Sequence, residues 1–532
     1  MKNNECIFFE NLYSFGKNIA LVDSQTKQKM TYAALDEQSD EVAKTIGFEK
    51  ELVFIEAKKS IESVVVYIGA LKANKVVYLL DDIQDDKSQL LIELYQPNII
   101  ISEAIGVKRQ SEDRQHFHKD LTLLLSTSGS TGSPKFVKLS AKNLQSNAKS
   151  IAEYLRLNET DIAMSHLKLH YSYGLSVLHS HLVVGAATVF TSHGVLDESF
   201  WLDIKEFSAT NFAGVPYTFE ALSKKKFDFT PYDSLRYITQ AGGKLEASLV
   251  QQYASATQNL GIEFYVMYGQ TEAAPRISYL PPELAAEYPS SIGRAIPGGM
   301  LKIIDEKGHE ITGEDIQGEL AYQGDNVMMG YAENKDDLLL DETPSVLFTG
   351  DIACKTSSGL FYIVGRTKRF VKMFGLRVNL DDVQSYVKKS YPQSAVAGND
   401  ESITIAIEES SHAGTSFLIA DLAVKYSLPK NRFKIIFFDP LPLLSSGKYD
   451  YKAIMDVELP KVGLIPKIIN KVADILGLTT NEWVSIHVLF KDVLPLEDVS
   501  ENDIFDNLDT DSLSFVQLSI ELERCLGEEC CG

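Results

Sequence analysis

The pattern that most constrains the fold is a regular alternation of short apolar runs and helical stretches between about residues 50 and 280. Helical stretches such as 60–73 and 86–96 separate the apolar runs. Strands that alternate with helices form βαβ units, which build mostly parallel sheets covered on both faces. The sequence therefore predicts an α/β fold of layered βαβ sheets, in which ligands bind at the carboxyl ends of the strands. The predicted strands are 53–57, 76–81, 98–102, 121–127, 187–191, 211–215, 235–239 and 264–269.

The pattern changes twice further along the chain. From about 296 to 365, short runs separated by Gly and acidic turns predict a small antiparallel, β-barrel-like part. A compact α+β stretch follows Lys368, and a linker-like segment lies near 456–465. We therefore predict three domains: a large N-terminal core (1–367), a small α+β C-terminal domain (368–459) and a short all-α tail (465–532).

Charge and composition exclude several classes of partner. The chain has 51 Lys and Arg against 73 Asp and Glu, a formal net charge of −22. Such an acidic chain is expected to repel nucleic acid and anionic lipid, so a polyanionic ligand needs its own local site. No secretory signal pattern and no apolar run of membrane-spanning length is visible, which favours a cytoplasmic protein. The five cysteines show no zinc spacing and are expected to be reduced thiols.

The strongest local signal is the segment 123–140, LLLSTSGSTGSPKFVKLS. A buried strand is expected to lead into a loop of glycines and hydroxyl residues that ends at Lys135, and a helix is expected to start near Ser140. Glycines let backbone N–H groups turn toward an anion, and the lysine adds a positive charge. The loop therefore predicts a phosphate site, and the alternative is a mobile Ser/Gly linker. Its candidate ligands are Thr127, Ser128, Gly129, Ser130, Thr131, Gly132 and Lys135.

Seven segments in order resemble the motifs of the adenylate-forming superfamily, which includes acyl-CoA synthetases, adenylation domains of nonribosomal peptide synthetases and luciferase. The resemblance covers about residues 1–455. It implies a large core and a small mobile C-terminal lid, with ATP and Mg²⁺ as cofactors. The segments are STSGSTGSPK (126–135), AGGKL (241–245), YGQTEAAPR (268–276), GELAYQGDNVMMGY (318–331), FTGDIA (348–353), GRTKRFVKMFGLRV (365–378) and LPLLSSGKYD (441–450).

The resemblance implies roles for individual residues. Lys448 would be the catalytic lysine of adenylation, Thr271 would donate to the α-phosphate, and Glu272 would bind Mg²⁺ together with Thr127. Lys368 would be the hinge of the lid, and Lys372 and Gly375 would lie in the loop used for thioester formation. The adenine and ribose would lie against Ala241, Gly242, Gly243, Tyr268, Gly269, Asp351 and Arg366.

The segment 166–176 bears on the acid. Alignment on Gly174 places Tyr171 at the aromatic position of the acyl pocket and Ser172 where amino-acid-activating relatives carry an aspartate; His170 is the alternative for the aromatic position. A serine does not neutralise a buried ammonium. The sequence therefore favours a carboxylic acid without an α-amine, such as a fatty, short acyl or aryl acid.

The last segment, 465–532, resembles an acyl or peptidyl carrier domain, in which Asp511-Ser512 would be the phosphopantetheine attachment pair. The alternative is that Ser512 is a plain helix N-cap. Only 20 residues follow Ser512, so the segment is expected to be an incomplete carrier.

Three functions follow from these observations. The first is an ATP-dependent acid–thiol ligase that passes an acyl group to a phosphopantetheine thiol, either of a carrier protein or of coenzyme A. A phosphopantetheinyl transferase would be a partner if Ser512 is modified. The second is an amino-acid adenylation module of a peptide synthetase. The third, of another class, is a non-catalytic nucleotide-binding scaffold.

Overall fold

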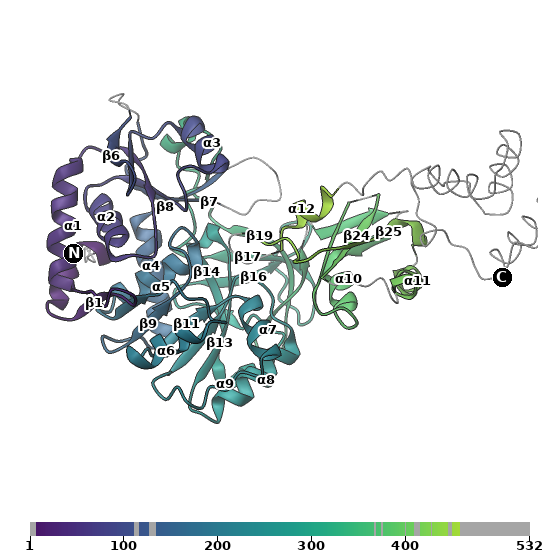
Figure 1. The fold of residues 1–532 in the computed structure, drawn as a ribbon. Coiled ribbons are helices and arrows are strands. Elements are labelled where there is room, and N and C mark those ends of the chain that lie inside the picture. Colours follow the sequence, from purple (N-terminus) through teal and green to yellow (C-terminus); the bar gives the residue numbers. More distant parts are fainter. Residues whose placement is uncertain are drawn as a thin grey trace, which may run out of the picture. The chain divides into compact units, whose positions relative to one another are not determined.

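The computed structural model of the chain describes residues 7–110, 116–126, 135–366, 369–373, 376–399, 401–408, 415–426, 428–444 and 449–457 (Figure 1). It divides into two compact units. The first comprises Met1–Tyr386 and Leu441–Asp450, and the second comprises Val387–Pro440 and the chain from Tyr451 onward. The three domain ranges given above stay predictions.

A nine-stranded sheet forms one layer of the first unit. Its central strands, from β13 to β1, are parallel, and antiparallel strands close both edges. Apolar residues fill these strands because helices cover the sheet. In order across the sheet, the strands are β15 (Arg294–Ala295), β14 (Arg276–Leu280), β13 (Glu263–Gly269), β12 (Tyr237–Gln240), β11 (Asn211–Gly214), β9 (Ile162–Ser165), β10 (Ala187–Phe190), β1 (Ile19–Asp23) and β2 (Lys29–Thr31).

A seven-stranded sheet forms the second layer. Its four central strands β7, β4, β3 and β5 are parallel, as the βαβ pattern predicts. Strand β8 pairs antiparallel with β7, so the predicted phosphate loop joins two strands of one hairpin before the next helix begins. The order is β18 (Tyr331–Ala332), β8 (Phe136–Ser140), β7 (Leu121–Ser126), β4 (Val76–Leu80), β3 (Leu52–Glu56), β5 (Ile99–Ser102) and β6 (Gly106–Arg109).

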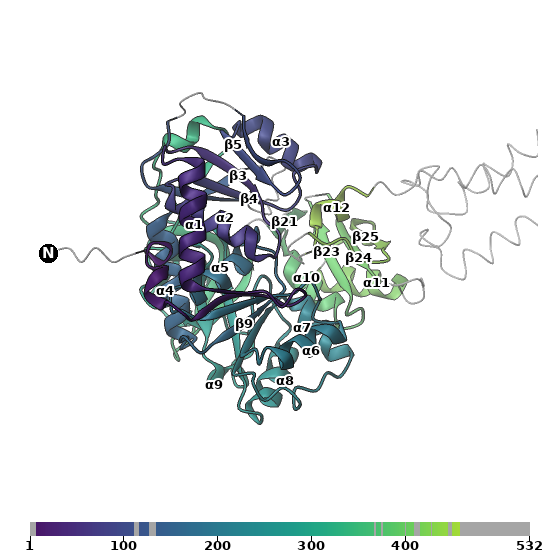
Figure 2. The same ribbon diagram turned by 60° about the vertical axis from the view of Figure 1, so that its left-hand side comes forward.

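Helices cover these sheets. Four of them begin at Thr31, Ser60, Asp85 or Ser140, whose side chains accept a hydrogen bond from a backbone N–H of the first turn. Helix α2 is apolar on most sides because most of its residues are buried, and it packs against α1, beside which it lies in Figure 2. The helices are α1 (Tyr32–Ile46), α2 (Ile61–Lys72), α3 (Asp86–Tyr95), α4 (Ala141–Tyr154), α5 (Ser172–Leu182), α6 (Glu198–Glu206), α7 (Pro216–Lys224), α8 (Ala247–Gln258), α9 (Pro282–Ala285) and α10 (Leu380–Val387).

The predicted antiparallel part is a four-stranded sheet. It contains β16 (Met300–Ile304), β17 (Gly318–Gln323), β19 (Leu347–Lys355) and β20 (Phe361–Arg366), with a core of Ile303, Leu320, Ala353 and Phe361. A separate hairpin follows, formed by β21 (Phe370–Met373) and β22 (Leu376–Asn379).

The second unit contains a three-stranded sheet of β23 (Ser394–Gly398), β24 (Ile403–Ile407) and β25 (Phe433–Phe437). Helix α11 (Thr415–Tyr426) packs near β25, and α12 (Tyr451–Met455) packs against β23. The predicted α+β character of this stretch is therefore confirmed. The carrier-like tail lies outside the described residues. Within the part of the chain that the structure describes, no helix is long and apolar enough to cross a membrane.

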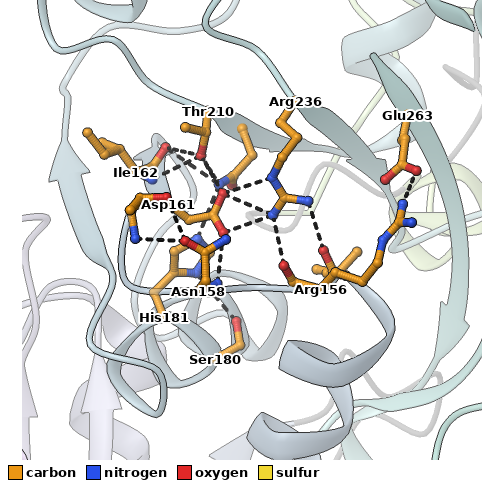
Figure 3. Close-up of polar contacts among 12 residues, drawn as sticks. Arg156, Asn158, Asp161, Ile162, Ser180, His181, Thr210, Arg236 and Glu263 are labelled. Carbon is orange, nitrogen blue, oxygen red and sulfur yellow. Dashed lines mark hydrogen bonds and ion pairs between the residues drawn. The ribbon is translucent and has the colours of Figure 1, made fainter. Parts of the chain in front are cut away.

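A buried ionic network ties the amino ends of three neighbouring strands together (Figure 3). Asp161, Thr210 and Arg236 are the residues that immediately precede β9, β11 and β12. Arg236 donates to both carboxylate oxygens of Asp161, and the Nη2–Oδ2 distance is 2.8 Å. Thr210 donates to the same carboxylate at 3.0 Å, and so does the backbone N–H of Asn158 at 2.9 Å. The side chain of Asp161 is only 2% exposed, so this network stabilises the end of the sheet opposite to the predicted site.

We expect Asp161→Asn to lower the free energy of unfolding by about 3 kcal/mol, because it leaves the Arg236 guanidinium without its counterion. Urea denaturation measures this change. The control is Asp325→Asn, which removes an exposed ion pair to Lys142 and is expected to cost less than about 1 kcal/mol. Equal effects of the two substitutions would contradict the assignment.

Candidate functional site

The predicted site segments follow the carboxyl ends of neighbouring parallel strands. Tyr171 and Ser172 lie beyond β9, residues 241–243 follow β12, and Thr271 and Glu272 follow β13. Strands β13, β12, β11 and β9 are adjacent in that order, so these segments gather along one edge of the sheet. This is the edge at which ligands bind in folds of this kind.

Two glycines permit close packing, one between the predicted acyl and adenine segments and one within the acyl segment. Gly242 has a positive φ of 89°, and a Cβ there would lie 2.5 Å from the Tyr171 hydroxyl oxygen. A Cβ at Gly174 would lie 2.5 Å from the carbonyl oxygen of Lys168. Neither position accommodates a larger side chain without movement. The Tyr171 phenol, whose pKa burial raises to about 12, is therefore a neutral group beside Gly242.

The adenine segment is fixed by its own hydrogen bonds. Ala241 is buried, and its N–H donates to the carbonyl of Gly214 at 3.2 Å. The side-chain amide of Gln240 donates to the carbonyl of Gly243 at 2.9 Å. Gly269 lies where a Cβ would meet the carbonyl oxygen of Pro275, so the backbone after β13 also requires a glycine.

Three of the predicted adenine and ribose residues form one cluster. The hydroxyl of Tyr268 donates to Oδ2 of Asp351, and Nε of Arg366 donates to Oδ1 at 2.9 Å. Asp351 is buried, whereas the Arg366 side chain is about half exposed. Burial, and then the Asp351 carboxylate, raise the pKa of Tyr268 well above its ordinary value, so this phenol remains a donor. The Asp351 carboxylate keeps lone pairs for a further hydrogen-bond donor.

A second cluster joins the predicted metal ligand to the end of the phosphate loop. Tyr331 donates from its hydroxyl to Oε1 of Glu272 at 2.8 Å. Nζ of Lys135 lies 3.8 Å from the centroid of the Tyr331 ring, a cation–π contact. Burial, and then Glu272, raise the pKa of Tyr331 above its ordinary value. Residues 135, 272 and 331, far apart in the sequence, thus gather a cation and a carboxylate around one aromatic ring.

The loop after Glu272 is held by an asparagine. The Nδ2 group of Asn326 donates to the carbonyls of Ala273 at 2.6 Å and Arg276 at 2.7 Å. Tyr322 donates to Oδ1 of the same side chain at 2.8 Å. These contacts fix the orientation of the short 3₁₀ helix Thr271–Ala273, which carries Thr271 and Glu272.

Several predicted residues lie outside the described residues: Thr127, Ser128, Gly129, Ser130, Thr131, Gly132, Lys368, Gly375, Lys448 and Ser512. Lys372 lies on β21, within the hairpin. Their roles stay predictions.

The donor set fits Mg²⁺ held largely by a nucleotide. Within the described ranges, no group of three or more His, Cys, Asp or Glu side chains could hold a metal ion by itself. Mg²⁺ is commonly held by one or two carboxylates together with phosphate oxygens. Glu272, beside the Lys135 end of the phosphate loop, is a carboxylate of this kind.

Sequence reasoning did not single out Tyr331, Asn326 or Arg276 as site residues. Each lies inside a motif that was recognised, at 318–331 or 268–276. Their side chains contact residues of separate segments, and a single sequence does not show which distant residues meet in the fold.

Residues 83–332 match the AMP-binding enzyme family. Oxalate–CoA ligase of Arabidopsis thaliana is 28% identical over 58% of this chain and 59% of its own length. D-alanine–D-alanyl carrier protein ligase of Lacticaseibacillus rhamnosus is 27% identical over 80% of this chain and 93% of its own length. The chain therefore spans about three fifths of the first of these relatives and nearly all of the second.

Solved structures share the fold. o-Succinylbenzoate CoA synthetase from Bacillus subtilis, in complex with an acyl-adenylate intermediate, has a TM-score of 0.70 and 21% identity; the alignment covers 85% of this chain and 99% of that one. The same enzyme in complex with ATP and a magnesium ion has a TM-score of 0.69 and 20% identity; the alignment covers 85% of this chain and 100% of that one. The predicted fold class, a large α/β domain followed by a smaller one, is confirmed.

Proposed function

We propose, since the chain carries an AMP-binding enzyme domain and the fold of adenylate-forming enzymes, that it is an AMP-forming acid–thiol ligase. It activates a carboxylic acid with ATP and passes the acyl group to a phosphopantetheine thiol. The observation that carries this proposal is the meeting of Glu272, Tyr331 and Lys135. A carboxylate suited to Mg²⁺ and a lysine suited to phosphate lie beside one ring. Binding of a nucleoside triphosphate with its Mg²⁺ requires both groups.

In the first half-reaction, a carboxylate oxygen of the acid forms a bond to the α-phosphorus of ATP, and the bond to pyrophosphate breaks. Lys135 and the loop before it bind the outgoing phosphates, and Thr271 donates to the α-phosphate. Asp351 accepts from the ribose, while Tyr268 and the glycines at 242 and 243 enclose the adenine. Bound Mg²⁺, which Glu272 and Thr127 would hold, supplies positive charge to the phosphates. We assign to Lys448 the neutralisation of charge between the acid and the ribose.

In the second half-reaction, the thiol loses its proton and its sulfur forms a bond to the acyl carbon. The bond between that carbon and the phosphate oxygen of AMP breaks, and AMP leaves. We assign to Lys368 the hinge, and to Lys372 and Gly375 the loop that the thiol arm passes. The acceptor is coenzyme A or a carrier, of which Ser512 is the candidate attachment site. If Ser512 is modified, a phosphopantetheinyl transferase is a further partner.

The acid is expected to lack an α-amine. Ser172 is the first residue of α5 and is half-buried, so no carboxylate is available at that position to pair with an ammonium. Amino-acid activation is the second candidate, favoured by the similarity to D-alanine–D-alanyl carrier protein ligase. The first candidate requires an acid without an α-amine, and the second requires an amino acid.

ATP–pyrophosphate exchange tests the proposal. The full chain is supplied with Mg²⁺ and a panel of fatty, short acyl, aryl and amino acids, and exchange is expected only when a non-amino acid is present. Omission of the acid or of Mg²⁺ is the control. Exchange restricted to amino acids would select the second candidate. Tight ATP binding without exchange for any acid would show a non-catalytic nucleotide-binding protein and would refute the ligase.

A further inference from the structure

Arg276 is a buried cation beside the candidate acyl site. It opens β14, four residues after Glu272, and is only 3% exposed. Nη2 donates to Oγ of Ser176 at 3.4 Å, and the guanidinium carbon lies 4.9 Å from the centroid of the Tyr173 ring. Its Nε is buried and has no hydrogen-bond partner. The side chain is therefore positioned by neutral groups and keeps an unused donor.

No carboxylate neutralises this guanidinium among the described residues. The ion pairs of that part of the chain include buried cations, such as Lys75 with Glu51, but none that involves Arg276. Burial raises the pKa of Tyr154, Tyr171 and Tyr173, and the charge of Arg276 opposes the rise, so all three phenols nearby are neutral. An unpaired buried charge is costly. The cost is offset when a ligand brings an anion.

Arg276 lines a small cavity, which a bound carboxylate group has to widen. Tyr237 lines the same cavity, and its hydroxyl is also buried without a partner. The remaining wall is apolar or already bonded; for example, Asn211 lies 3.2 Å from Nε2 of His181, which Figure 3 shows beside the ionic network. The cavity thus offers one guanidinium and one hydroxyl without a hydrogen-bond partner.

Helix α5 connects this cavity to the candidate acyl site. Ser172 is its first residue; the next residue, Tyr173, and Ser176, one turn further along, line the cavity. The ring of Tyr171 packs edge-on against that of Tyr173, with centroids 6.2 Å apart. A group bound at Arg276 is therefore on the same side of the sheet as the candidate acyl residues.

We propose that the acid carries a second carboxylate, which binds Arg276 in this cavity; the inference rests on the proposed function and names its substrate class. A guanidinium donates two parallel hydrogen bonds to a carboxylate, and the free Nε is one of the donors that this geometry uses. The same cation repels an ammonium, which agrees with the neutral Ser172.

The test compares acids of equal length in ATP–pyrophosphate exchange: butyrate with succinate, and valerate with glutarate. We expect the wild-type protein to prefer the dicarboxylate of at least one pair. Arg276→Met is expected to lower kcat/KM for that dicarboxylate by at least about 30-fold, because truncating one partner of a buried charge pair has effects of this size. Its kcat/KM for the monocarboxylate is expected to be unchanged or higher.

Two controls separate recognition from structure. Arg294→Met alters an exposed arginine stacked on Tyr279 and is expected to leave the preference unchanged. The unliganded Arg276→Met protein is expected to melt at the same or a higher temperature, because a buried unpaired charge is removed. If it does not fold, Arg276→Lys replaces it, with a smaller loss of preference expected.

The outcomes are distinct. Wild-type exchange that is equal for both acids of each pair would overturn the inference and leave the proposed function standing. Equal losses for both acids in Arg276→Met, with a lower melting temperature, would show a structural arginine and would also overturn it. Absence of exchange with every acid, including those of the wider panel, would refute the proposed function itself.

Discussion

Replacing Glu272 by glutamine is expected to slow adenylate formation about a thousandfold, the loss typical of removing a principal electrostatic group from a charged transition state. The substitution removes one negative charge beside the phosphate loop and keeps the shape of the side chain. We attribute the expected loss to weaker binding of Mg²⁺ to the nucleotide.

The contacts of Glu272 make this variant a clean test. Its Oε1 accepts the Tyr331 hydroxyl at 2.8 Å, and a glutamine carbonyl oxygen accepts the same bond. The backbone carbonyl of Glu272 accepts from the N–H of Met328 at 2.9 Å, which no side-chain change alters. We therefore expect the melting temperature to stay close to that of the wild type.

Pyrophosphate exchange at several Mg²⁺ concentrations measures the effect. The matched variant is Tyr331→Phe, which removes the hydroxyl donor and keeps the ring beneath Lys135. Its loss is expected to be about tenfold, the size of one hydrogen bond to a charged group. A Glu272→Gln protein that exchanges at the wild-type rate at low Mg²⁺ would contradict the assignment of the metal ligand.

The layered βαβ fold could be predicted because its signal is local. Each strand from β3 to β13 that the sequence predicts is an apolar run long enough to be recognised, and the helices between them begin at recognisable caps such as Ser60 and Asp85. The resemblance to the adenylate-forming superfamily agrees with the match of residues 83–332 to the AMP-binding enzyme family, and the ligase activity is the proposal that this match supports. Motif order needs no knowledge of three-dimensional contacts.

Strand β8 was missed because its sequence, FVKLS, contains a lysine and leads directly into the cap of α4. The Lys138 side chain is buried in the structure, where Nζ donates to the carbonyls of Asp337 and Leu340. The two carbonyls that accept from Lys138 lie about 200 residues further along the chain, so the local sequence does not show that this lysine is buried.

Site partners were missed for the same reason. Tyr331 and Arg276 lie inside recognised motifs, but their roles depend on their neighbours in the fold. Tyr331 binds a carboxylate 59 residues away, and Arg276 lines a cavity whose wall contains no carboxylate. The sequence marks residues that a family shares, whereas the absence of a counterion is visible only after the chain has folded.

Asp351→Asn is expected to lower kcat/KM for ATP about a hundredfold, because several hydrogen bonds to one charged group are weakened together. The carboxylate accepts the Tyr268 hydroxyl and the Nε–H of Arg366. An asparagine has one acceptor oxygen, so its NH₂ group faces one of these two donors. The side chain at position 351 is then no longer held in a fixed orientation, and its negative charge is no longer available to a ribose hydroxyl.

The division between KM and kcat decides whether Asp351 binds the nucleotide. We expect most of the loss to appear as a higher KM for ATP, with the KM for the acid little changed. Tyr268→Phe is the matched control: it removes one donor to Asp351, keeps the ring, and is expected to raise the KM for ATP by less than about tenfold. If Asp351→Asn left the KM for ATP unchanged while lowering the melting temperature, the cluster would serve only to join β13 and β19, and its assignment to the ribose would be wrong.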